Sequence, residues 1–151
     1  MIRIGIASDH RGDVLIGQII DRLVDKYDIT DCGTYSEESV DYPDYAFKLG
    51  NLVADKDVDF GIAICGSGIG ISIACNKVKK VRCAKVSNEK EAQITRNDND
   101  ANIVAFSAET KLEEALKIID TFITTPFSNC ERHQKRIDKI TRYEEETWQE
   151  N

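Results

Sequence analysis

The chain has 151 residues, 41% of them hydrophobic and 31% charged, which fits one globular domain with its own core. Its formal net charge of −7 argues against nucleic acid or an anionic membrane as the main partner, while a local cluster of cations can still hold a small anionic substrate. No apolar run approaches the length of a membrane span and the first residues lack a signal-peptide layout, so we expect a cytoplasmic protein.

Short apolar segments alternate with segments of helical periodicity along the chain. Strands are predicted at residues 3–7, 27–33, 60–64, 81–87 and 101–106. Helices are predicted at residues 12–26, from Pro43 to about Val53, from Gly70 onward, at 88–97, at 111–124 and in a charged C-terminal segment of about 129–148. Strict alternation means parallel strands joined by right-handed crossovers, so the sequence predicts an α/β fold and a single domain, 1–151.

The cysteines are typical of a reduced, cytosolic protein. They are odd in number and widely spaced, without a C-x-x-C pattern, which fits neither a disulfide framework nor a zinc site. The five are Cys32, Cys65, Cys75, Cys83 and Cys130. With two histidines in the chain, a histidine-rich metal site is not expected either.

Polar residues follow two of the predicted strands, where parallel sheets bind their ligands. Asp9 and His10 come after the first strand, and Cys65 to Gly70 come after the third. Asn99 lies between the short helix and the fifth strand, which places it at the opposite end of the sheet. Another subunit or a loop would have to bring it to the same site.

The stretch "CGSGIG" after the third strand is a G-x-G-x-G loop at a strand-to-helix turn. It is neither the dinucleotide fingerprint nor a P-loop, which ends in Gly-Lys-Ser/Thr. Its free backbone N–H groups can hold an oxyanion or a phosphate, and the alternative is a structural turn. Cys65 is either a buried small hydrophobe or a reactive thiol that the helix start favours as thiolate.

Two further motifs each allow a structural and a functional interpretation. In "SDHRG", Ser8 or Asp9 is either a helix N-cap or, with His10, part of a site. In "ERHQKR", Arg132 and Arg136 lie four apart on one helix face beside His133. This arrangement is either a solvated basic turn or a binding site for phosphate.

Taken together, five stretches occur in one order: "SDHRG", "DYPDYA", "ICGSGIGISIACNK", "NDAN" and "ERHQKR". Over about residues 1–145 this set resembles the sugar-phosphate isomerase family of ribose-5-phosphate isomerase type B and the galactose-6-phosphate isomerase subunits, and it is most similar to the type B branch. The resemblance implies a Rossmann-like three-layer sandwich with a five-stranded parallel sheet. It also implies a homodimer or tetramer whose active sites are shared between subunits.

The resemblance further implies aldose–ketose isomerisation through a cis-enediolate, without a metal or an organic cofactor. Cys65 matches the proton-transfer base, and Ser67 matches a hydroxyl that moves protons between the sugar oxygens. The remaining matches are grouped by what they would contact. The backbone amides of Gly66, Ser67, Gly68, Ile69 and Gly70 resemble the anion hole, Asp9, Tyr42 and Asn99 correspond to sugar contacts, and His10, Arg132, His133 and Arg136 match the phosphate site.

Three positions depart from the family pattern. Asp98 replaces a histidine thought to open the sugar ring, Glu109 stands where an arginine near the phosphate is usual, and Lys80 replaces a glycine before the fourth strand. The sequence therefore leaves three interpretations. The first is a ribose-5-phosphate isomerase. The second is an isomerase of a six-carbon phosphosugar such as allose or galactose 6-phosphate, as one subunit of a hetero-oligomer or alone. The third is a weakly active relative that binds a phosphosugar or a nucleotide as a regulatory or interaction module.

Overall fold

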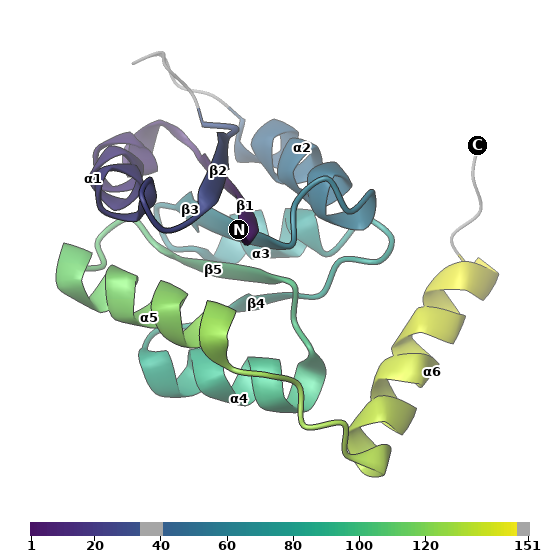
Figure 1. Ribbon diagram of the computed structural model, residues 1–151. Helices are drawn as coiled ribbons and strands as arrows, with labels where there is room; N and C mark the ends of the chain where they lie inside the picture. The colour runs from purple at the N-terminus through teal and green to yellow at the C-terminus, as the bar shows by residue number, and fades with distance from the viewer. Residues whose placement is uncertain (34–40, 148–151) are drawn as a thin grey trace.

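Five parallel strands form one sheet between two layers of helices (Figure 1). The computed structural model describes residues 1–33 and 41–147. The strands are β1 (Arg3–Ser8), β2 (Asp28–Asp31), β3 (Phe60–Cys65), β4 (Cys83–Lys85) and β5 (Ile103–Ser107). They lie side by side in the order β2-β1-β3-β5-β4, and every neighbouring pair is parallel. The predicted α/β class and the five-stranded parallel sheet are confirmed.

The helices follow the strands in alternation and end the chain. After a short 3-10 turn, η1 (His10–Gly12), they are α1 (Asp13–Leu23), α2 (Tyr42–Ala54), α3 (Ile69–Cys75), α4 (Glu89–Asn99), α5 (Leu112–Thr124) and α6 (Glu131–Thr147). Residues typical of helix starts stand at the beginning of two of these helices. Pro43 stands in the first turn of α2, and the side chain of Asn88 accepts the N–H of Glu91 at the start of α4.

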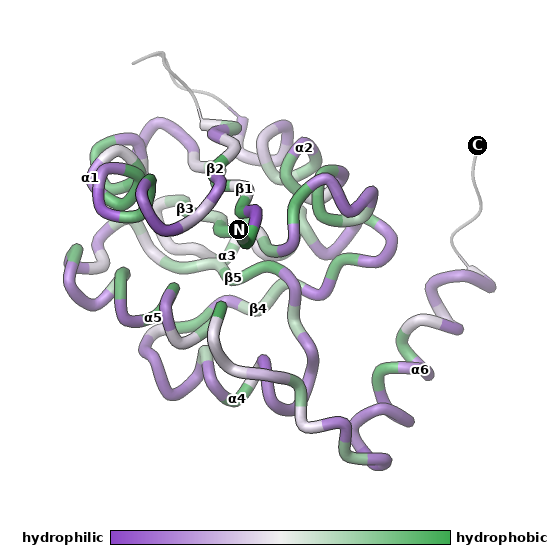
Figure 2. Tube along the Cα trace, in the orientation of Figure 1, coloured by the Kyte–Doolittle hydropathy of each residue, from purple (hydrophilic) through white to green (hydrophobic). Residues whose placement is uncertain are grey.

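The two faces of the sheet carry side chains of different size. One face presents large residues such as Ile62 and Phe106 to α1 and α5, and the other presents small residues such as Ala63 to α2 and α3. The close approach of α2 requires this, because a Cβ built on Gly61 would lie 3.2 Å from Cδ1 of Leu49. Figure 2 shows the central strands β1, β3 and β5 as mostly apolar, as expected where both faces are covered.

Helix α6 extends away from the sheet and is largely polar (Figures 1 and 2). It buries His133 and Ile137, whereas Ile140 and Tyr143 are 58% and 68% exposed. Its attachment includes one bond from the loop before β4, because the Lys80 N–H donates to Oε2 of Glu144 at 2.9 Å. In a single chain, this helix therefore leaves apolar side chains in water.

The predicted ends of several helices and strands were wrong. Helix α6 begins at Glu131 rather than 129, because Asn129 has a left-handed φ of 57°, and the predicted last residue, 148, lies outside the described residues. Helix α4 includes Asn99, which the sequence placed in a connection, because the helix stops at Asp100 with φ 47°. The strand predicted at 81–87 and the helix predicted at 12–26 are both shorter in the structure.

Over residues 1–33 and 41–147, no helix combines the length and the apolar character needed to cross a membrane.

Candidate active site

The carboxyl ends of β1 and β3 bring the first group of candidate residues together. The two strands are neighbours in the sheet, and the Asp9 N–H donates to the Ile64 carbonyl at 3.3 Å. Asp9 and His10 therefore lie beside Cys65, the last residue of β3. Because β2 lies on one side of β1 and β3 on the other, this is the switch point of the sheet, where open α/β sheets bind ligands.

The thiol of Cys65 points into the glycine loop and is 4% exposed. Its Sγ accepts a hydrogen bond from the Gly68 N–H at 3.2 Å, a contact that fixes the position of the sulfur against the loop. Gly68 has φ 79°, and a Cβ there would lie 2.6 Å from the backbone carbon of Phe106. The loop therefore needs glycine at this position to place its N–H against the thiol.

The rest of the loop is held by hydroxyl groups. Ser67 is exposed, and its Oγ accepts the N–H of Ile69 at 3.1 Å. The hydroxyl of Ser107 donates to the Gly66 carbonyl at 2.7 Å and ties the loop to the end of β5. Two of the five amides expected to hold an anion, those of Gly68 and Ile69, therefore bond to side chains of the loop itself.

Asp9 and His10 differ in how they are held. Asp9 is 7% exposed, and its Oδ1 accepts the Arg11 N–H at 3.0 Å, so its predicted role as an N-cap is confirmed, for the 3-10 turn η1. The Nδ1 atom of His10 is buried and lacks a hydrogen-bond partner among the residues described. This nitrogen therefore has capacity for a ligand or for a second chain.

Tyr42 reaches the same loop from the first residue of α2. A Cβ built on Gly70 would lie 2.6 Å from Cζ and 2.7 Å from Oη of Tyr42. Glycine at position 70 thus makes room for the phenol ring at the start of α3. Nine candidates gather at this end of the sheet and are called the thiol edge below: Asp9, His10, Tyr42, Cys65, Gly66, Ser67, Gly68, Ile69 and Gly70.

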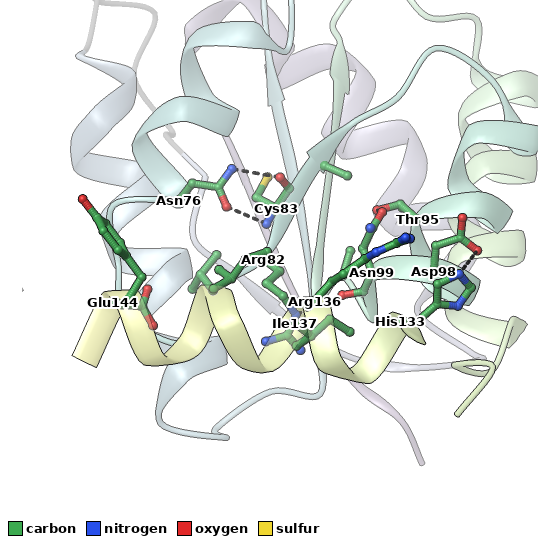
Figure 3. Close-up of a pocket in the computed structure, with 15 residues that line it drawn as sticks. Asn76, Arg82, Cys83, Thr95, Asp98, Asn99, His133, Arg136, Ile137 and Glu144 are labelled. Atoms are coloured by element: carbon green, nitrogen blue, oxygen red, sulfur yellow. Dashed lines mark hydrogen bonds and ion pairs between the residues drawn. The ribbon is translucent and has the colours of Figure 1, made fainter. Parts of the chain in front are cut away.

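Four of the other candidates line a cavity of about 520 Å³ between α6, α4 and β4 (Figure 3). Asp98, Asn99, His133 and Arg136 face it, and they are called the α6 pocket residues below. Buried His133 contacts Ser128 through Nδ1, 2.9 Å from Oγ, and Asp98 through Nε2, 3.7 Å from Oδ1. Asp98 thus faces an imidazole rather than solvent alone.

Arg132 has a different position from Arg136, although the two lie one helical turn apart. Arg136 lines the cavity, whereas exposed Arg132 lies outside it and donates from Nη1 to Sγ of Cys130 at 3.2 Å. The opposite wall of the cavity carries Cys83. The pKa of the Cys83 thiol is raised well above its ordinary value, first by a hydrogen bond with Cys75 and second by burial. This cysteine is therefore neutral at pH 7.

One chain keeps the thiol edge and the α6 pocket residues apart. In the register of β3 with β5, Cys65 pairs with Ser107 and Gly61 pairs with Ile103. Because Asn99 ends α4 just before β5 begins, it lies at the Gly61 end of the sheet, opposite the thiol. The expectation that Asn99 lies at the opposite strand end is confirmed.

Two contacts at the thiol edge were missed from the sequence. Ser107 binds the Gly66 carbonyl, and the Arg11 guanidinium lies against Gly66. Neither contact follows from spacing along the chain, because each joins the ends of two different strands. Across the described ranges, no group of three or more His, Cys, Asp or Glu side chains is placed to hold a metal ion.

Comparison with known proteins agrees with this geometry. A model of the family described as ribose/galactose isomerase matches residues 4–140. Ribose-5-phosphate isomerase B of Escherichia coli (strain K12) is 40% identical over 147 residues, covering 96% of this chain and 98% of that protein.

Solved structures are similar over nearly the whole chain. Ribose-5-phosphate isomerase B of Clostridium thermocellum has a TM-score of 0.93 at 42% identity and covers 97% of this chain and 100% of its own. The Mycoplasma genitalium enzyme with bound ribulose-5-phosphate has a TM-score of 0.90 at 41% identity, with coverages of 97% and 98%. The resemblance seen in the sequence is thus confirmed, and this chain belongs to the ribose/galactose isomerase family.

Proposed function

We propose that this protein interconverts ribose 5-phosphate and ribulose 5-phosphate, an aldose–ketose isomerisation that needs no metal or organic cofactor. The observation that carries the proposal is the thiol of Cys65 at the switch point of the sheet, bonded to the Gly68 amide. Support comes from relatives named ribose-5-phosphate isomerase B, one of them with ribulose-5-phosphate bound. A reduced thiol in such a loop favours an enzyme over a phosphosugar-binding module.

Cys65 acts as the general base of the proposed reaction. As thiolate it takes the proton from C2 of the open-chain aldose, and the electron pair of the broken C–H bond forms the C1–C2 double bond of a cis-enediolate. The same proton returns to C1, which yields the ketose. Ser67, on the exposed rim of the loop, moves the other proton between the two sugar oxygens.

The glycine loop stabilises the charge that this step creates. In the proposed anion hole, the amides of Gly66, Ser67 and Gly70 donate to the enediolate directly, because those of Gly68 and Ile69 bond to the loop's own side chains. The Gly68 amide acts through the sulfur instead. Donors held in place before the reaction need no reorganisation during it, which is the main advantage of such a loop.

The remaining candidates bind the rest of the substrate. Asp9 and Tyr42 contact the sugar from the thiol edge, where both already border the loop. Asn99 contacts it from the α6 pocket. The phosphate is bound by cationic groups from both places, namely His10, Arg132, His133 and Arg136.

These assignments require two copies of the chain, and we propose a homodimer, alone or paired into a tetramer, in the cytoplasm. Each active site then combines the thiol edge of one subunit with the α6 pocket residues of the other. Exposed apolar side chains on α3 and α6 suit such an interface: Ile69 is 54% exposed, Ile73 57% and Tyr143 68%.

A substrate comparison tests the proposed function. Purified protein without added metal is assayed for isomerisation of ribose 5-phosphate, allose 6-phosphate and galactose 6-phosphate, with kcat/KM as the readout. We expect the highest value for ribose 5-phosphate. A higher kcat/KM for a six-carbon sugar would show that this sugar, and not ribose 5-phosphate, is the substrate. Binding without turnover of any of the three sugars would show that this chain is a weakly active relative.

A further inference from the structure

The side chain of Arg11 lies on the glycine loop of the thiol edge and has no assigned role. A Cβ built on Gly66 would lie 2.8 Å from Cζ and 3.2 Å from Nε of Arg11, so the guanidinium packs directly against Gly66. Gly66 stands between Cys65 and Ser67, the two groups proposed to move protons. Arg11 therefore places a permanent positive charge at the mouth of the site.

This guanidinium is weakly held in the single chain. Its nearest charged partner is Glu109, with Nη2 4.0 Å from Oε1, and the two side chains are 58% and 83% exposed. An exposed pair at this distance contributes little to the stability of the fold. Among residues 1–33 and 41–147, the Arg11 side chain makes no hydrogen bond, so its donors are available to a ligand.

The acidic residues near Arg11 would repel a phosphate, and the positive charge of Arg11 can offset them. Asp9 and Glu109 are both acidic and both lie near the loop, and a dianionic phosphate brought to His10 would be repelled by them. Glu109 stands at the position where an arginine near the phosphate is usual. Arg11, which contacts Glu109, is placed to offset this carboxylate and to supply the cation from a different element.

We propose that Arg11 binds the substrate phosphate at the thiol edge, with Glu109 holding its guanidinium in place until substrate arrives. This inference rests on the proposed function, because it takes the ligand to be a phosphosugar. The exchange is favourable because bidentate, charge-assisted hydrogen bonds from Arg to phosphate are stronger than an exposed ion pair at 4.0 Å.

The test uses Arg11→Ala, Arg11→Lys and Glu109→Gln in the full-length protein. The Arg11→Ala change spares the local fold, because Asp9 accepts the backbone N–H of residue 11, which alanine retains. Arg22→Ala is the matched control, since Arg22 forms a similar exposed pair with Glu113 at 3.3 Å on another surface. The readouts are the Kd of inorganic phosphate by calorimetry, and KM and kcat for ribose 5-phosphate.

We expect Arg11→Ala to raise both the phosphate Kd and KM about 10- to 100-fold with a smaller change in kcat, because it removes charged hydrogen bonds to the ligand. Arg11→Lys should recover part of the affinity, and Glu109→Gln should tighten phosphate binding a few-fold, because it removes a competing carboxylate. Arg22→Ala should match the wild type in every readout.

Phosphate affinity and KM that are unchanged in Arg11→Ala would overturn the proposal and leave Arg11 as a surface ion pair. A wild-type protein that binds no phosphate would overturn it as well. A different result would overturn the proposed function. If the protein binds phosphate through Arg11 but does not isomerise ribose 5-phosphate, the role of Arg11 stands and ribose 5-phosphate is not the substrate.

Discussion

The Gly68 N–H points at Sγ of Cys65 over 3.2 Å, so the turn that ends β3 supplies a hydrogen-bond donor to the residue that ends it. The same turn requires the left-handed φ of 79° that glycine adopts without strain. The strand, the glycine and the thiol thus form one unit. A proton-transfer role for Cys65 follows from this unit more directly than from the residue type.

Removing the thiol should abolish turnover while the fold persists. Cys65→Ala deletes the proposed general base, and the loss of a positioned base lowers kcat about 100- to 10,000-fold. Circular dichroism and the phosphate Kd should remain close to those of the wild type, because Cys65 is small and is not proposed to bind phosphate. Cys32→Ala, at a buried cysteine outside the thiol edge, is the matched control. Most of the activity surviving in Cys65→Ala would refute the assignment.

Arg136 and Arg132 are expected to act on substrate binding. Arg136→Ala should raise KM with a smaller change in kcat, and inorganic phosphate should compete with substrate in the wild type. Arg136→Lys should restore affinity in part, because lysine lacks the planar fork that binds phosphate bidentately. Steady-state kinetics of Arg132→Ala, Arg136→Ala and Arg136→Lys, with Lys135→Ala as a neighbouring control, measure this. Unchanged KM in both alanine variants would make the arginines surface charges.

Asp98 is expected to contribute to ring opening from the α6 pocket. Its Oδ1 lies 3.7 Å from Nε2 of His133 and the residue lines the same cavity as Arg136, so the carboxyl group is placed to exchange a proton with the sugar. Asp98→Ala should therefore lower turnover of the ring-closed sugar, by up to about 100-fold if proton donation becomes limiting.

The rate at high enzyme concentration identifies the affected step. When ring opening is no longer catalysed, the rate in Asp98→Ala should stop rising with added enzyme and reach that of spontaneous opening. Asp98→His, which restores an acid–base group with a pKa near neutrality, should recover turnover. A neutral Asp98→Ala together with a less active Asp98→His would exclude this role and favour a different substrate.

Lys80 is expected to lower the stability of the folded protein because of its backbone conformation. Its φ of 73° lies in the left-handed region, which strains a residue with a Cβ by about 1 kcal/mol or more. Lys80→Gly should raise the melting temperature by about 2–4 °C for a chain of this size. It retains the backbone N–H that bonds Glu144. Lys79→Gly, at a position without a positive φ, should lower the melting temperature, and equal effects of the two changes would contradict the backbone explanation.

The elements and the thiol edge could be predicted because they depend on local pattern and on one rule of parallel sheets. Apolar runs gave the strands, and Asp9 and Cys65 had to meet because the ends of neighbouring parallel strands share an edge. The contact of Arg11 with Gly66 could not be predicted, because the path of a long side chain across a loop leaves no periodic signal. The end of α4 at Asp100 was missed because this residue is not the glycine that usually marks a left-handed C-cap.

The α6 pocket was predicted in part. The sequence placed Asn99 at the far end of the sheet and grouped His133 with Arg136, and both findings hold in the structure. That Asp98 faces His133 follows from the packing of α6 on α4, which depends on tertiary contacts between a polar helix and the body of the protein.

The central claim is that the thiol edge of one subunit works with the α6 pocket residues of another. Complementation of two inactive variants tests it most directly. Cys65→Ala and Arg136→Ala subunits carrying different tags are co-expressed, and the mixed dimer is purified. It is assayed on ribose 5-phosphate at a substrate concentration at which the Arg136→Ala dimer shows no activity. Each mixed dimer then holds one site with both residues intact, so we predict about half of the wild-type activity. A mixed dimer no more active than its parents would contradict the shared site.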